Sequence, residues 1–232
     1  MLLLAAGRGT RFGGPVPKAY LPLQGRPLLV HSAKRLLDAC GPPHTAQLIV
    51  IVHAADRPTH LAACLRELEN VAAGRAGLRV VDGGDSRQES MQRGMAAADA
   101  DADLVLVHDA ARALLPVAAT RACIAAAAAT GAALLAIPAT DTLKRVRGGL
   151  VESTLDREGV WSAQTPQVLR RSLLQQALAA AAASGFEGTD DVSLVERLAH
   201  PVAVVEGSPT NVKITRPSDL PLAEFLLGAA LA

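Results

Sequence analysis

A glycine-rich segment near the start of the chain carries residue types that bind phosphate. The apolar run 2–6 opens into Gly7-Arg8-Gly9-Thr10-Arg11, and Pro17-Lys18 follows. Glycine lets backbone N–H groups approach an anion closely, and arginine and lysine neutralise its charge. A buried strand that ends in glycines and then cations is typical of α/β proteins that bind nucleotides. The segment therefore predicts a phosphate site at the end of a first strand.

Two commoner phosphate motifs do not fit this segment. A P-loop needs a glycine, four free positions and then Gly-Lys-Ser/Thr, and the sequence has no such run. A dinucleotide fingerprint needs a glycine five positions after Gly7, where Phe12 stands. A glycine-rich turn without a ligand is the simpler alternative. The added cations Arg11 and Lys18 favour phosphate binding over that alternative.

The composition of the chain limits its size class and the kinds of partner it could bind. A chain of 232 residues is long enough for one α/β domain with a sizeable core. A formal net charge of +1 and an aromatic content of 2% argue against a nucleic-acid partner. Lysine is scarce, and Lys18 and Lys213 both fall in predicted loops or near strand ends, where functional residues are common and where a compact ammonium can do what arginine cannot.

The cysteines and apolar runs predict a cytoplasmic protein without a membrane span. Cys40, Cys64 and Cys123 are scattered and lack CxxC spacing, so we expect buried thiols in a reducing compartment. The N-terminal apolar run is too short for a secretory signal. The run 122–139 is nearly all apolar, but Thr130-Gly131 divides it into a helix and a strand.

Short apolar runs alternate with amphipathic stretches along the chain. Strands are predicted at 2–5, 48–52, 78–81, 104–107, 132–137 and 202–205. Helices are predicted at 27–38, 59–69, 87–98, 117–129, 170–183, 191–199 and 217–227. The strands are continuous Val/Ile/Leu runs, so both sheet faces should be covered by helices. The pattern predicts an α/β fold: a doubly wound, mainly parallel, Rossmann-like sheet in a single domain of residues 1–232.

Residues 140–160 interrupt this alternation. Two β-prone segments, 142–146 and 151–155, flank Gly148-Gly149. Such a pattern predicts a β-hairpin, and its late insertion into a parallel sheet indicates an arm that leaves the core.

Polar clusters follow the predicted strands. Asp82-Gly83-Gly84-Asp85 follows the third strand, and His108-Asp109-Ala110-Ala111-Arg112 follows the fourth. Turn residues are common at strand ends in general, which is the alternative explanation. Because ligands of such sheets bind at the carboxyl ends of the strands, we expect both clusters to join the glycine-rich segment in one site.

Taken together, these motifs resemble the 2-C-methyl-D-erythritol 4-phosphate cytidylyltransferase family, a branch of the nucleotidyltransferases. The resemblance runs from residue 3 to about 225. The matching segments are Ala5-Ala6-Gly7-Arg8-Gly9-Thr10-Arg11, Pro17-Lys18, Val81-Asp82-Gly83-Gly84-Asp85-Ser86-Arg87, Ser90, Val107-His108-Asp109-Ala110-Ala111-Arg112, Asp141-Thr142-Leu143-Lys144, Asp156-Arg157, Trp161, Thr165-Pro166-Gln167, Thr189-Asp190 and Asn211-Val212-Lys213-Ile214-Thr215-Arg216-Pro217.

The resemblance implies a reaction and its site residues. A phosphate oxygen of 2-C-methyl-D-erythritol 4-phosphate would attack the α-phosphate of CTP in line and release pyrophosphate. The implied catalytic residues are Lys18, Lys213 and Arg11. The implied nucleotide-binding residues are Ala5, Ala6, Gly7, Gly9, Thr10, Gly84, Asp85, Ser90, Asp109 and Ala110. The implied acceptor-binding residues are Arg112, Thr142, Arg157, Thr165 and Thr189.

The resemblance also implies a metal and a partner. Mg²⁺ or another divalent cation would bind at Asp109, and the arm would join two copies of the chain in a homodimer. His108 has no second ligand at metal-binding spacing, so we interpret it as structural. Leu4 and Ala19 depart from the family's usual residues but remove no cation.

Two other functions fit the same motifs. A related cytidylyltransferase would act on another polyol phosphate, such as ribitol 5-phosphate. A regulatory module would bind CTP without turnover, although the joint presence of Arg11, Lys18, Asp109 and Lys213 disfavours it.

Overall fold

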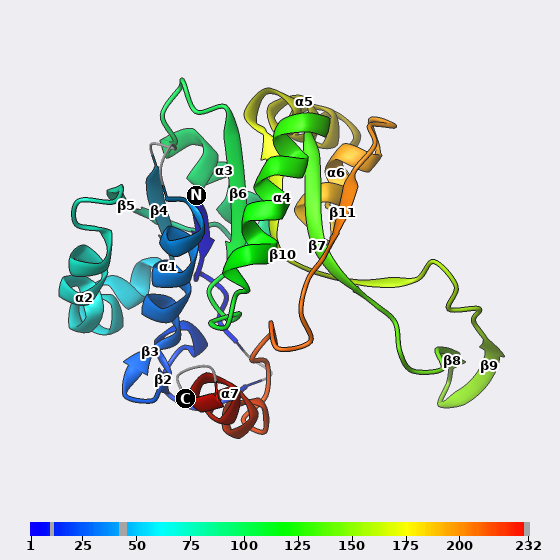
Figure 1. The fold of residues 1–232 in the computed structure, drawn as a ribbon, viewed down its shortest axis with the longest axis horizontal. Coiled ribbons are helices and arrows are strands. Elements are labelled where there is room, and N and C mark those ends of the chain that lie inside the picture. Colours follow the sequence, from blue (N-terminus) through cyan, green and yellow to red (C-terminus); the bar gives the residue numbers. More distant parts are fainter. Residues whose placement is uncertain (10–11, 42–45, 230–232) are drawn as a thin grey trace.

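The structure is a computed structural model that describes residues 1–9, 12–41 and 46–229. At its centre lies a seven-stranded sheet with the strand order β11-β7-β10-β6-β1-β4-β5 (Figure 1). These strands are β1 (Leu2–Leu4), β4 (Gln47–Val52), β5 (Gly77–Asp82), β6 (Leu104–Asp109), β7 (Ala132–Pro138), β10 (Trp161–Arg170) and β11 (Ala203–Glu206).

The sheet is mainly parallel, as the sequence predicts. Neighbouring strands run parallel on both sides of β1 and between β7 and β11. β10 runs antiparallel to both β6 and β7. β10 was not predicted from the sequence, because Pro166 interrupts its apolar pattern. Its register against β7 shifts between Ala163 and Gln167.

Helices cover both faces of this sheet. One face packs against α1 (Leu28–Ala39), α2 (Ala62–Ala72) and α4 (Val117–Thr130), which contribute Leu29, Leu68 and Ile124 to a shared core. The other face packs against α3 (Arg87–Ala97), α5 (Arg171–Ser184) and α6 (Asp191–Glu196). This arrangement confirms the doubly wound α/β fold.

A third apolar cluster is formed by elements that lie below the sheet in Figure 1. There α7 (Asp219–Ala229) packs near the short hairpin of β2 (Pro22–Leu23) and β3 (Arg26–Pro27). Ile214, which is fully buried in this cluster, ties the segment before α7 to the body of the molecule.

The predicted helices are present, with shifted ends. α2 begins later than predicted because the π-helical turn Arg57–Leu61 precedes it. α4 ends at Thr130, and the C-cap Gly131 has a left-handed φ of 97°, so glycine there separates the helix from β7. Within the described ranges, no helix is both long and apolar enough to cross a membrane.

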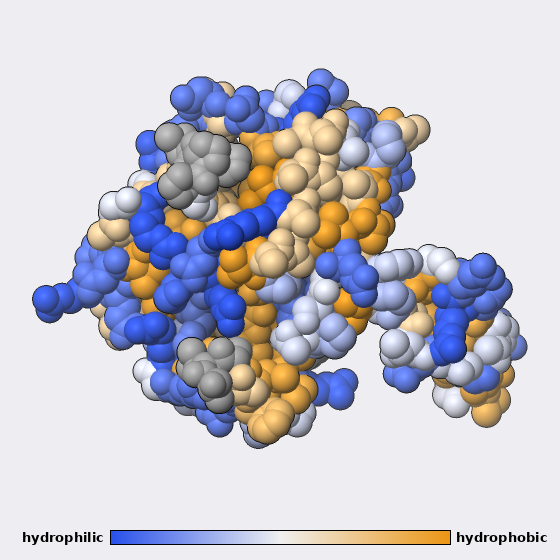
Figure 2. Space-filling view, viewed as in Figure 1, coloured by the Kyte–Doolittle hydropathy of each residue, from blue (hydrophilic) through white to orange (hydrophobic). Residues whose placement is uncertain are grey.

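The predicted hairpin is confirmed as an arm. β8 (Lys144–Arg147) and β9 (Leu150–Thr154) form a separate two-stranded sheet that projects far from the body (Figure 1). Gly148 and Gly149 form its turn, with φ of 58° and 81°, a conformation that glycine adopts without steric cost. Its surface mixes hydrophilic and hydrophobic residues (Figure 2).

Candidate active site

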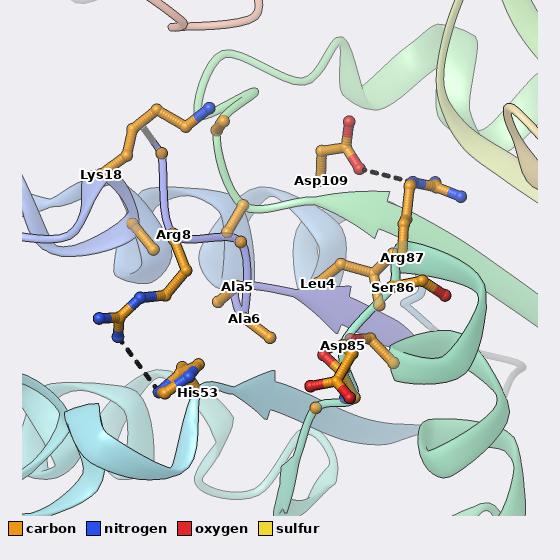
Figure 3. A pocket seen from close by; sticks show the side chains of 18 of the residues that line it. Leu4, Ala5, Ala6, Arg8, Lys18, His53, Asp85, Ser86, Arg87 and Asp109 are labelled. Atoms are coloured by element: carbon orange, nitrogen blue, oxygen red, sulfur yellow. Dashed lines mark hydrogen bonds and ion pairs between the residues drawn. The ribbon is translucent and has the colours of Figure 1, made fainter. Parts of the chain in front are cut away.

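A cavity of about 440 Å³ opens at the carboxyl ends of β1, β4, β5 and β6 (Figure 3). The glycine-rich segment and both polar clusters predicted from the sequence line it together. Of the predicted residues, those that line it are Ala5, Ala6, Gly7, Gly9, Lys18, Gly84, Asp85, Ser90, Asp109, Ala110 and Lys213. Thr10 and Arg11 lie outside the described residues.

The glycine-rich segment places Lys18 at the cavity. Gly9 has a φ of 61°, and a Cβ atom there would lie 3.2 Å from Cβ of Lys18. Lys18 begins a short 3₁₀ turn, and the next two residues, Ala19 and Tyr20, are buried in the core. The Lys18 side chain therefore lines the cavity from a backbone that is anchored in the core.

The opposite wall of the cavity is shaped by Gly83, Gly84 and α3. A Cβ atom on Gly83 would lie 2.4 Å from Cβ of Ala6, so glycine alone allows β1 and this turn to approach each other. The Gly84 N–H donates to Oγ of the buried Ser90 at 3.0 Å. Ser86 caps the start of α3 by accepting from the Glu89 N–H at 3.1 Å. Ala6, Gly83, Gly84 and Ser90 therefore form one closely packed wall of the cavity.

Asp109 lies between two cations at the end of β6. Nζ of Lys213 is 2.6 Å from its Oδ2, and Nε of Arg87 is 3.5 Å from its Oδ1. Burial by itself raises the pKa of Asp109, but the charges of Arg87 and Lys213 outweigh it and hold the pKa well below the usual range. The carboxylate is therefore ionised at neutral pH.

Lys213 is placed by a buried amide two residues before it. The Asn211 side chain donates to Oε1 of Gln164 at 3.1 Å and to the Thr165 carbonyl at 3.0 Å. The Asn211 carbonyl in turn accepts from Arg112 at 2.7 Å. The Asn-x-Lys segment is thus fastened to β10 and to the end of β6, and Lys213 faces Asp109 as a result.

His108 and Thr165 support the same strand end from behind. His108 is fully buried, and burial lowers its pKa to about 4, so the ring is neutral. The buried Thr165 hydroxyl lies 2.9 Å from Nδ1 of His108 and accepts from the Asp109 N–H at 3.2 Å. The interpretation of His108 as structural agrees with these contacts.

The predicted acceptor-binding residues do not gather in the cavity of this single chain. Arg112 is half-buried and bonds backbone carbonyls, and the Thr165 hydroxyl is engaged with His108. Thr142 and Arg157 are exposed on the arm, where Arg157 donates to the Thr140 carbonyl. Thr189 is exposed just before the N-cap of α6.

Arg87, Arg8 and His53 are among the lining residues that were not predicted from the sequence. Arg87 ends the matching segment Val81-Asp82-Gly83-Gly84-Asp85-Ser86-Arg87 and reaches Asp109. Arg8 and His53 form the rim, with Nη1 of Arg8 3.3 Å from Nδ1 of His53. Figure 3 shows Arg8 and Lys18 on one side of the cavity, and Arg87 and Asp109 on the other. The position of Arg87 within a recognised motif was a usable signal, whereas His53 has no motif around it.

A family model described as 2-C-methyl-D-erythritol 4-phosphate cytidylyltransferase matches residues 1–229. The chain belongs to this family. The relatives of that name from Acidobacterium capsulatum and Syntrophotalea carbinolica are 42% and 43% identical. The matches cover 98% of this chain in both cases and 96% and 95% of those proteins.

Solved structures of the family share the fold. The 2-C-methyl-D-erythritol 4-phosphate cytidylyltransferase of Thermus thermophilus has a TM-score of 0.78 and 34% identity, and the match covers 97% of each chain. The 4-diphosphocytidyl-2C-methyl-D-erythritol synthase of Anaerococcus prevotii has a TM-score of 0.80 and 26% identity, over 98% of this chain and 96% of that one. Family membership over nearly the full length supports CTP-dependent cytidylyl transfer in isoprenoid biosynthesis as the activity.

Proposed function

We propose that this protein transfers the cytidylyl group of CTP to 2-C-methyl-D-erythritol 4-phosphate and releases pyrophosphate. The observation that carries the proposal is the meeting of Lys18, Lys213 and Asp109 at one cavity edged by a glycine-rich loop. Attack of an already ionised phosphate oxygen on the α-phosphate of CTP needs no protein nucleophile. The new P–O bond forms as the bond to the β-phosphate oxygen breaks.

The difficulty of this reaction is electrostatic, because two polyanions must meet. Lys18 and Lys213 would bind the triphosphate and neutralise the charge that develops at the α-phosphate. Arg11 and the Gly7–Thr10 backbone would hold the β- and γ-phosphates and the leaving pyrophosphate, and here Arg11 and Thr10 rest on sequence alone. The cavity wall of Ala5, Ala6, Gly84, Asp85 and Ser90 would bind cytosine, a ring small enough for it.

Asp109 fits a divalent cation that arrives with the nucleotide. Within the described part of the chain, no group of three or more His, Cys, Asp or Glu residues is placed to hold a metal ion. Mg²⁺ commonly binds one or two carboxylates together with substrate phosphates and water, and the ionised Asp109 supplies one such carboxylate. The cation would add positive charge at the phosphates, and Asp109 would fix where that charge lies.

The acceptor half of the site would be completed by a second copy of the chain. The arm exposes apolar side chains that an isolated hairpin has no reason to carry, including Val146, Leu150 and Val151, which are 56%, 76% and 63% exposed. Homodimer formation through the arm would bury them and bring Thr142 and Arg157 to the partner's cavity. A guanidinium binds phosphate bidentately, which suits Arg157 to the acceptor phosphate.

The dimer is tested by light scattering on Val151→Asp, with Glu152→Lys on the other face of β9 as the charge-changing control. We expect Val151→Asp to be monomeric and Glu152→Lys to remain dimeric. A monomeric wild-type protein would contradict the proposal.

A cytoplasmic location is proposed from the free, buried Cys40, Cys64 and Cys123, because free thiols are typical of a reducing compartment. Cell fractionation tests this location.

The activity is tested by pyrophosphate release across a panel of nucleotides and acceptors. We expect turnover with CTP and 2-C-methyl-D-erythritol 4-phosphate and little with UTP, ATP or GTP. Faster turnover with ribitol 5-phosphate would reassign the acceptor while keeping the transfer chemistry. CTP binding without pyrophosphate release from any acceptor in Mg²⁺ would indicate a regulatory module instead.

A further inference from the structure

The two cations that flank Asp109 are held in different ways. Lys213 reaches the carboxylate at 2.6 Å on a flexible side chain that is 39% exposed. Arg87 lies farther away, at 3.5 Å, but its other guanidinium atoms are committed elsewhere. Its Nη1 and Nη2 donate to Oδ1 and Oδ2 of Asp191 at 2.7 and 2.8 Å. Lys213 can therefore move by side-chain rotation, whereas Arg87 is fixed.

Asp191 is itself immobilised in the core. Its side chain is 1% exposed, and its backbone N–H donates to Oε1 of Gln167 at 2.8 Å. The same Gln167 donates to Oδ2 of Asp190 at 2.7 Å, and Asp190 caps α6. Hydrogen bonds from Gln167 therefore fix the start of α6 to β10. Because both oxygens of Asp191 accept from Arg87, the Arg87 guanidinium is held in one orientation as well.

The proposed function places Lys213 on the triphosphate, but the structure pairs it with Asp109. Moving Lys213 away would leave a carboxylate with a 12% exposed side chain, and an unpaired buried charge is strongly unfavourable. Arg87 resolves this conflict, because it stays beside Asp109 wherever Lys213 goes.

We propose that Arg87, held by Asp191, is the permanent counter-ion of Asp109 and thereby lets Lys213 transfer from that carboxylate to the nucleotide triphosphate. Arg87 is on this view a positioning residue that acts through Asp109 and Lys213. The inference rests on the proposed function in taking CTP as the nucleotide, but it does not depend on the acceptor. It also does not require a bound metal.

The test is the CTP affinity of the full-length protein, measured by calorimetry in EDTA so that no metal intervenes. Arg87→Gln is combined with Asp191→Asn, which removes the buried pair without leaving a lone charge. We expect the Kd for CTP to rise about tenfold or more, the size of one lost charge-assisted contact. In an Asp109→Asn background, where no carboxylate holds Lys213, the same pair of changes should leave the Kd unaltered.

Two further variants keep the test decisive. Arg87→Lys retains the charge and should recover much of the affinity. Asp191→Asn alone releases Arg87 without removing it and should weaken binding by an intermediate factor, which gives a readout if the combined variant does not fold. Thermal melting of each variant establishes that the compared proteins are folded.

Several results would overturn the inference. An unchanged Kd in the Arg87/Asp191 variant would show that Lys213 needs no replacement at Asp109. A Kd penalty of equal size in the Asp109→Asn background would show that Arg87 contacts the nucleotide or only supports the fold. Wild-type protein that binds CTP neither in EDTA nor in Mg²⁺ would overturn both proposals. The expected Kd pattern without pyrophosphate release from any acceptor would sustain this inference and reject the proposed function.

Discussion

Nδ1 of His108 lies 2.9 Å from Oγ1 of Thr165, within a run of hydrogen bonds that joins two antiparallel strands. Nε2 of His108 lies 3.1 Å from the Arg112 carbonyl, which can only accept, so Nε2 carries the proton. Nδ1 therefore accepts from the Thr165 hydroxyl, whose oxygen accepts from the Asp109 N–H at 3.2 Å. A neutral imidazole is the one form of His108 that satisfies every partner.

Replacing His108 should make the free energy of unfolding depend less on pH in the acidic range. Its pKa of about 4 lies below the unfolded value of about 6.5, so the unfolded chain binds more protons between these values. The free energy of unfolding should therefore fall as pH drops from 6.5 towards 4, by an amount on the order of 3 kcal/mol from this group. Urea unfolding at several pH values measures it.

His108→Gln keeps a donor and an acceptor but does not titrate in this window. We expect the variant to be less stable at pH 7, and to lose less stability than the wild type on acidification. Parallel pH curves for the two proteins would contradict the assigned neutral ring.

Removing either proposed catalytic lysine should reduce turnover without unfolding the protein. Lys18→Ala and Lys213→Ala should each lower kcat by about 10²–10³, the typical cost of one lost donor to a developing anion. Lys34→Ala is the matched control, because Lys34 lies on α1 in an exposed pair with Asp38. Pyrophosphate release measures kcat, and near-wild-type rates for either lysine variant would refute its role.

Asn211→Ala should lower activity, because Asn211 anchors the segment that positions Lys213. The change removes the donors to Gln164 and Thr165 that fasten this segment. We expect kcat to fall at least tenfold, with a loss of stability of about 1–3 kcal/mol from the buried partners left unpaired. The exposed neighbour Thr210 offers a control in Thr210→Ala. Unaltered kcat in a folded Asn211→Ala protein would show that Lys213 does not depend on this anchor.

The two adjacent glycines of the cavity wall should respond differently to alanine. At Gly83 the new Cβ would lie 2.4 Å from Cβ of Ala6, which cannot move without shifting β1. At Gly84 the new Cβ would lie 2.2 Å from the end of the Glu89 side chain, which can rotate away. Gly83→Ala should therefore weaken CTP binding and lower the melting temperature more than Gly84→Ala. Equal effects in calorimetry and melting would contradict this interpretation of the wall.

The strand ends and the chemistry placed on them could be predicted from the amino-acid sequence alone. Glycines, Lys18 and Asp109 could be assigned to one edge because apolar runs mark the strands, and parallel strands bring their carboxyl ends together. The Gly148-Gly149 turn and its β-prone flanks likewise predicted the arm. These features depend on residues that are near neighbours in the chain.

Which distant side chains meet became clear only from the packed molecule. Arg87 pairs with Asp191 across 104 positions, and His108 meets Thr165 across 57. The His108–Thr165 contact depends on β10 lying antiparallel beside β6. The Arg87–Asp191 contact depends on the start of α6, which is hydrogen-bonded to Gln167 of β10. Strand order and register are properties of the packed sheet, and no local periodicity encodes them. For that reason the sequence supplies the charges of the site, and the fold determines which of them pair with one another.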